Sequence, residues 1–187
     1  MAVRSTLKGL WGEILNRLGH LLVLSRKDYH AFHNIILPCA GGTAEIDHLI
    51  VSPFGIFVIE TKHWSGWLLA SASDKTWTRL QFRSRIQVRN PLRQNFGHVM
   101  AIAELLGVLP EAITPLVAVR GAVFKTPVPP GVVCGGYAQH VRHYRVPRFA
   151  EAEVARVLAI LRSDRVGRGL FARVRHALRT RSRHTEA

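Results

Sequence analysis

The sequence predicts a mixed α/β domain, in which a central β-sheet is flanked by helices. Two observations support this prediction. Apolar residues recur at spacings of three and four in segment 6–24, and helices are also expected at 91–107 and about 149–162. Between these segments lie short apolar runs bounded by turn residues, which favour strands. The length of 187 residues suits one domain, 1–163, followed by a short arginine-rich helix or tail, 164–187.

The first half of the domain is predicted to be mostly β-structure. An amphipathic helix at 6–24 precedes a strand at 32–38, which Pro38 and a glycine turn end. A β-hairpin follows, with strands at 44–51 and 56–62. Two further short strands are predicted for "GWLLAS" and "WTRLQF", on either side of the turn residues "SDK".

The second half is predicted to alternate helices and strands. Asn90 is placed to cap a helix that begins at Pro91 and ends at Gly107. A strand at 114–124 and a Pro/Gly-rich loop follow. "VVCGGYA" and "HVRHYRV" are weaker strand candidates, and a last helix is predicted at 149–162.

The composition points to a polyanionic partner. The chain has 26 Lys and Arg against 12 Asp and Glu, a formal charge of +14. Folding does not require such an excess, which indicates nucleic acid or an anionic membrane surface. Cys39 and Cys134 lie far apart and outside any metal-binding spacing. With no apolar run long enough to span a bilayer, we expect a cytoplasmic protein.

The hairpin carries charges where a buried strand pair should be apolar. The connection "SPFG" predicts a register in which Asp47 lies opposite Glu60 and Glu45 lies opposite Lys62. Opposed side chains project from the same face, so all four charges would gather there. A slip of one residue would divide them between the two faces.

Two facing carboxylates repel each other unless a proton, a cation or Lys62 compensates. Carboxylate oxygens suit Mg²⁺ or Mn²⁺, which also bind phosphate oxygens. Lys62 could then neutralise a phosphate or help to orient and deprotonate an attacking water. An ordinary cross-strand charge network, formed by the pairs Asp47–Glu60 and Glu45–Lys62, explains the same pattern without a metal.

Together, these residues resemble the nuclease-related domain (NERD) family, a branch of the PD-(D/E)XK nuclease superfamily. The resemblance rests on "EIDHLIVSPFGIFVIETKHWSGW", with Asp47 on one strand and Glu60-Thr61-Lys62 on the next, and extends over about residues 9–107. "KGLWGE" resembles the family's first helix and "NPLRQ" its Asn-Pro-x-x-Gln motif. His63 departs from the pattern, because the family commonly has Asn there.

The resemblance implies a restriction-endonuclease-like core and a role for each matching residue. Asp47 and Glu60 would bind the metal, and Lys62 would act as catalytic base or neutralise a phosphate. Glu13 would add a carboxylate from the first helix, and Gln94 would line the site. Glu13 also has a structural explanation, a helical salt pair with Arg17 four residues on. Gln94 lies in a first helical turn, where polar residues are ordinary.

Aromatic and basic residues elsewhere have competing interpretations. Trp64, Trp67 and Trp77 could stack on bases, although packing within strands is the commoner role. His48 is expected in the core, pointing away from the carboxylates. The arginine-rich tail could bind nucleic-acid phosphates, rest on an anionic membrane or be a solvated end. Its candidate nucleic-acid contacts are Arg173, Arg175 and Arg179.

The function predicted from these observations is that of a metal-dependent nuclease that hydrolyses phosphodiester bonds, with DNA as the expected substrate. Mg²⁺ or Mn²⁺ is the expected cofactor, and no small-molecule cofactor is expected. Two alternatives remain open from the sequence. One is a non-catalytic nucleic-acid-binding module with the same fold. The other is a peripheral membrane protein that meets lipid through its basic C-terminal segment.

Overall fold

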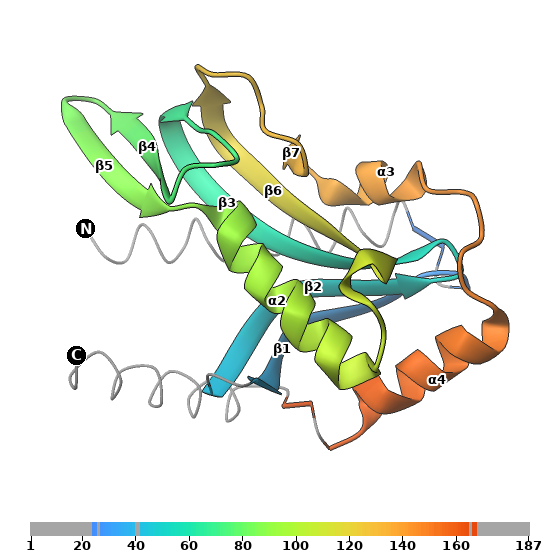
Figure 1. Ribbon diagram of the computed structural model, residues 1–187. Helices are drawn as coiled ribbons and strands as arrows, with labels where there is room; N and C mark the ends of the chain where they lie inside the picture. The colour runs from blue at the N-terminus through green and yellow to red at the C-terminus, as the bar shows by residue number, and fades with distance from the viewer. Residues whose placement is uncertain (1–23, 26, 40–41, 165, 168–187) are drawn as a thin grey trace.

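The computed structural model describes residues 24–25, 27–39, 42–164 and 166–167 (Figure 1). Within this part of the chain, one mixed seven-stranded sheet packs against helices, which confirms the predicted fold class. The strands are β1 (His30–Cys39), β2 (Gly42–Ser52), β3 (Gly55–Leu69), β4 (Thr76–Gln81), β5 (Ser84–Arg89), β6 (Ile113–Phe124) and β7 (Val132–Cys134). The helices are α2 (Pro91–Leu106), the 3₁₀ turn η1 (Pro110–Ala112), α3 (Tyr137–Arg142) and α4 (Glu151–Arg162).

β3 is the central strand of the sheet. Strands β1 to β5 pair in chain order, each antiparallel to the next. β6 enters beside β3 in the parallel direction, and β7 pairs in parallel with β6. Long neighbours on both sides fit the prediction that the hairpin of β2 and β3 lies inside the sheet rather than at its edge.

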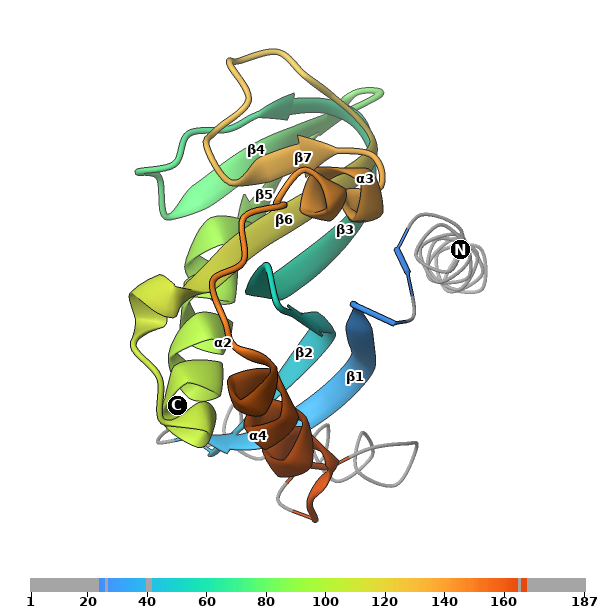
Figure 2. The same cartoon turned by 90° about the vertical axis from the view of Figure 1, so that its right-hand side faces the viewer.

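The sheet is buried on both faces around this hairpin. On one face, apolar side chains of β2 and β3 pack against α2 and α4; this cluster includes Leu49, Val58, Ile102, Val157 and Leu161. On the other face, a second cluster contains Ile50, Phe57, Ile59, Tyr137 and Val141, and so includes α3. Figure 2 shows α2 and α4 beside the ends of β1 and β2. Among the described residues, no helix is both long and apolar enough to cross a membrane.

Two predicted elements differ from the observed ones, and one observed strand was not predicted. "GWLLAS" is no separate strand, because β3 continues to Leu69 through a register shift between His63 and Gly66. Gly66 has φ 88°, and a Cβ there would lie 2.2 Å from the Leu80 carbonyl oxygen, so only glycine fits. β5 was not predicted, since five of its six residues are exposed and only Ile86 and Val88 are apolar. The strand predicted for "HVRHYRV" is wrong, because α3 occupies its first half.

The caps predicted for α2 are confirmed. Asn90 Oδ1 accepts a hydrogen bond from the Leu92 N–H at 2.9 Å, and Gly107 ends the helix with φ 63°. The Asn90 amide also donates to three carbonyl oxygens of the loop between β3 and β4, those of Ser71, Ala72 and Asp74. Asn90 is fully buried, so this one side chain joins the helix to the loop after β3.

A second asparagine fixes α2 against the sheet. Asn95 Nδ2 donates to the carbonyl oxygens of Val58 on β3, at 3.0 Å, and Leu116 on β6, at 2.9 Å. Val58 and Leu116 lie on the paired strands β3 and β6, so this one side chain binds both strands. The first turns of α2 are therefore held directly over β3.

The chain returns to β1 after α4. Ile36 and Gly167 exchange two backbone hydrogen bonds, 2.9 Å and 2.8 Å long, and Val166 is buried in the same cluster as α2 and α4. The predicted helix at 6–24 lies outside the described residues except for Leu24, and so do all but the first residues of the predicted tail.

Asn90→Ala is expected to lower the free energy of unfolding by about 2–4 kcal/mol, because it removes a cap and leaves three carbonyl oxygens without their donor. Urea denaturation followed by circular dichroism measures the change. Asn90→Ser is the matched control, since it keeps a capping oxygen and loses the amide donors without burying a charge, so its loss should be smaller. A loss below about 0.5 kcal/mol for Asn90→Ala would contradict this account.

Candidate active site

The candidate site lies along one edge of β3. On that edge, β2 pairs only with residues 55–59 and β4 only with residues 67–69. β6 occupies the opposite edge along almost the whole strand. Residues 60–66 of β3 therefore have no strand neighbour on one side, and their polar groups are available to other partners.

Asp47 occupies this gap with its side chain. The ladder between β2 and β3 has the predicted register but ends at the pair His48–Ile59. The Thr61 backbone N–H then donates to Asp47 Oδ2 at 2.8 Å, and the Thr61 hydroxyl donates to the same oxygen at 2.9 Å. The predicted direct pairs of Asp47 with Glu60 and of Glu45 with Lys62 are therefore wrong, because the strands diverge where a carboxylate replaces a backbone carbonyl.

The charge of Asp47 nevertheless acts on Glu60. Glu60 is only 2 % exposed, and this burial raises the pKa of its carboxyl group to about 7. The charge of Asp47 contributes to the rise, whereas Lys62 and Gln94 oppose it. Two acidic groups thus share one partly desolvated site, and near neutral pH the Glu60 proton is easily exchanged for another positive charge.

Lys62 lies between Glu60 and α2. Its Nζ donates to Glu60 Oε1 and, at 3.1 Å, to Gln94 Oε1. Glu60 and Lys62 are two residues apart on a strand, so they project from the same face, and Gln94 reaches them from the first turn of the helix. The structure thus brings together four of the five predicted catalytic residues, Asp47, Glu60, Lys62 and Gln94; the fifth, Glu13, lies outside the described residues.

His98 joins this group and was not predicted. Its Nδ1 lies 3.4 Å from Glu60 Oε2, and burial is the main cause that lowers the His98 pKa to about 4. Lys62 and Arg89 lower the pKa further, while Asp47 opposes them. Between about pH 4 and 7 both His98 and Glu60 are neutral, so their contact is not an ion pair. The available signal was its position four residues after Gln94, on the same helix face.

A pocket of about 580 Å³ opens beside these side chains. Its lining combines acidic, basic and small residues from β1, β2, β5 and α2: Cys39, Thr43, Ala44, Glu45, Asp47, Arg89, Gln94, Gly97 and His98. The pocket is large enough for a phosphate group with its surrounding waters, and Arg89 gives it a positive side opposite the carboxylates.

The residues at the pocket fit a hard divalent cation held partly by water. Glu60 Oε2 is buried and accepts no hydrogen bond from the described residues, an arrangement that costs free energy unless a cation or proton compensates. Both hydrogen bonds to Asp47 fall on Oδ2. Within the described part of the chain, no three His, Cys, Asp or Glu side chains converge on one point. Mg²⁺ commonly binds through one or two carboxylates and keeps several waters.

Several other predicted residues fall elsewhere. His48 is buried on the opposite side of the hairpin, 2.7 Å from His33 between their Nδ1 atoms, as expected for a core histidine. Cys39 lines the pocket and Cys134 does not, and neither forms a disulfide. The tail arginines Arg173, Arg175 and Arg179 lie outside the described residues, so their contacts with nucleic acid stay a prediction.

Comparison with known proteins places this site inside a recognised sequence family. The family model described as nuclease-related domain matches residues 8–124, which include every described residue of the site. An uncharacterized protein of Bacillus anthracis is 37 % identical over 101 residues, 53 % of this chain and 47 % of the relative. The chain therefore spans about half the length of this curated relative. No solved structure matches the chain.

The raised pKa of Glu60 predicts how stability changes with pH in the absence of divalent ions. Between pH 4.5 and about 7 the unfolded chain loses this proton and the folded chain retains it, so stability falls as the pH rises. The fall is on the order of 3 kcal/mol. Glu60→Gln should remove it, as measured by urea denaturation in EDTA at a series of pH values.

The pH profile of Glu60→Gln must be compared with that of wild type, because His98 also makes stability depend on pH. Its lowered pKa makes stability rise with pH, opposite to the effect of Glu60. Stability arising from neutral His98 is lost as the pH falls from 6.5 towards 4. Both proteins share this contribution, so it cancels in the difference. Parallel profiles for wild type and Glu60→Gln would show that Glu60 titrates normally.

Proposed function

Because the chain belongs to the nuclease-related domain family, a branch of the PD-(D/E)XK nucleases, we propose that it is a metal-dependent nuclease that hydrolyses phosphodiester bonds in DNA. The observation that supports this most directly is the convergence of Asp47, Glu60 and Lys62 at the open edge of β3. Such a reaction needs carboxylates that hold a cation and a cationic group that meets the phosphate. Asp47 and Glu60 supply the carboxylates, and Lys62 supplies the cationic group.

Asp47 and Glu60 would hold the cation, Mg²⁺ or Mn²⁺. Glu60 Oε2 has no hydrogen bond from the described residues and would be one ligand atom. Asp47 is held by Thr61 through Oδ2, so Oδ1 would be the other. A bound divalent cation supplies positive charge to the phosphate in the transition state and lowers the pKa of an attacking water.

Lys62 would act on the phosphate or on the attacking water. Its ammonium group is positioned by Glu60 and Gln94, so little side-chain freedom would be lost when substrate arrives. Gln94 is thus a positioning residue, which keeps the lysine directed towards the carboxylates. Arg89 lines the same pocket and would contact a neighbouring phosphate.

Lys62→Ala is expected to reduce cleavage of DNA at least 100-fold, because it removes the group that meets the reacting phosphate. Gln94→Ala should cost less, about tenfold, since the lysine stays but loses one of its two anchors. Cleavage of plasmid and single-stranded DNA with Mg²⁺ or Mn²⁺ measures both. Glu104→Gln, on the exposed side of α2, is the control. Wild-type cleavage by Lys62→Ala would contradict the assignment.

Asp47→Asn is expected to weaken Mn²⁺ binding at least tenfold, because it removes one of two carboxylate ligands. Isothermal titration calorimetry without nucleic acid measures the dissociation constant. Binding by wild type should release a proton below about pH 7, since Glu60 must lose its proton to act as ligand. If Asp47→Asn binds Mn²⁺ like wild type and Glu104→Gln, then Asp47 is not a ligand.

A further inference from the structure

A hairpin of β4 and β5 extends the sheet beyond β3 (Figure 1). It carries exposed aromatic and basic side chains. Phe82, in the turn between the two strands, is completely exposed, and Trp67 on β3 is 53 % exposed. The segment 76–89 contains four arginines and no acidic residue. Exposed rings beside arginines at this density are unlike an ordinary solvated hairpin.

Phe82 is a poor residue for its own turn. It occupies the first of two turn positions between the paired residues Gln81 and Ser84, with φ 52°. Glycine is preferred at this position, and a bulky side chain there is strained. The ring is fully exposed, so packing does not compensate for the strain. Strain kept without a structural gain is typical of a residue that meets a ligand.

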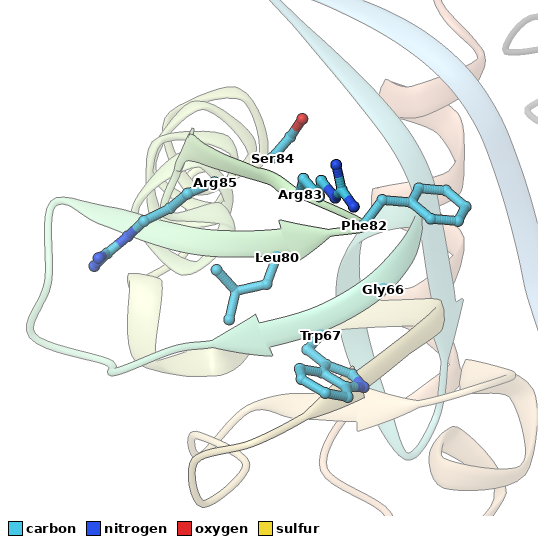
Figure 3. A pocket seen from close by; sticks show the side chains of 7 residues that line it. All are labelled: Gly66, Trp67, Leu80, Phe82, Arg83, Ser84 and Arg85. Carbon is cyan, nitrogen blue, oxygen red and sulfur yellow. The ribbon is translucent and has the colours of Figure 1, made fainter.

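A hollow of about 430 Å³ lies beside this ring, and Figure 3 shows its lining side chains. Trp67, Leu80 and Arg85 are successive cross-strand partners on β3, β4 and β5, so they form one row on the same face. The Lys125 ammonium lies 4.4 Å from the centre of the Trp67 ring. The predicted packing role holds for Trp77, which is fully buried, but not for Trp67.

The same face of β5 leads back to the candidate active site. Arg85, Gln87 and Arg89 alternate along the strand, so they project to one side. Arg89 lines the catalytic pocket, and Arg85 lines the hollow near the turn. The two arginines are about 13 Å apart along the strand. Positive charge therefore marks both ends of this face, beside the carboxylates and beside the exposed rings.

We propose that this face of the β4–β5 hairpin binds single-stranded nucleic acid. Bases would stack on Phe82 and Trp67, while Arg83, Arg85 and Arg89 would contact the phosphates between the turn and the catalytic pocket. A single strand fits better than a duplex, because only unpaired bases offer their faces to aromatic rings. That the bound strand continues towards the catalytic pocket rests on the proposed function. The binding surface on the hairpin does not depend on that function.

The experiment measures the binding of fluorescently labelled oligothymidylate by anisotropy in EDTA, where no cleavage occurs. Phe82→Gly should bind about tenfold more weakly than wild type. Its melting temperature should be unchanged or higher, because glycine relieves the strained turn. Phe82→Trp keeps a ring that can stack and should retain the wild-type affinity. Phe96→Ala, which removes an exposed ring from α2, is the matched control and should bind normally.

The salt dependence provides a second readout. Arg85→Gln should make the negative slope of log affinity against log salt less steep by about 0.7, because one phosphate contact with the single strand is lost. Unchanged affinity of Phe82→Gly, equal losses in Phe82→Gly and Phe82→Trp, or tighter binding of blunt duplex than of single strand would each overturn the proposal. Binding through Phe82 without cleavage by wild type would refute the nuclease and leave this surface established.

Discussion

The site depends on one substitution of hydrogen-bond partners, in which the Asp47 carboxylate takes the Thr61 N–H that a carbonyl of β2 would otherwise accept. From that point β2 continues beside β1 while β3 continues beside β6. The sheet therefore opens without leaving a backbone donor unpaired in a buried region. Because of this opening, Glu60 and Lys62 have no neighbouring strand on one side and lie beside the residues that line the pocket.

Helix α2, which lies over this opening, is fixed to the rest of the fold by buried hydrogen bonds. Asn90 and Asn95 lie on either side of Gln94 in sequence, and both are buried and hydrogen-bonded to carbonyl oxygens outside the helix. Their bonds fix the first turns of α2, so the Gln94 and His98 side chains reach the carboxylates from a rigid support. Bringing the Asp47 and Glu60 carboxylates close together costs free energy. The rigid support keeps them together, because the surrounding fold cannot relax to separate them.

Much of this arrangement could be predicted from the sequence, because it follows from local rules. The turn "SPFG" set the hairpin register, and the caps Asn90 and Gly107 set the bounds of α2. The end of the β2–β3 ladder could not be predicted, because it depends on a side chain competing with a carbonyl. His98 was missed because its role arises only when α2 packs over β3. β5 was missed because five of its six residues are exposed and its two apolar residues, Ile86 and Val88, are too few to mark a strand.

The two hydrogen bonds between Ile36 and Gly167 have a consequence for the solubility of shortened forms of the protein. Among the strands of the described residues, β1 lies at one end of the sheet. An uncovered end strand is a template for pairing with a second molecule. A chain cut after residue 163 would lose this pairing together with the buried Val166 side chain. Its free backbone groups and newly exposed apolar surface would then promote aggregation along β1.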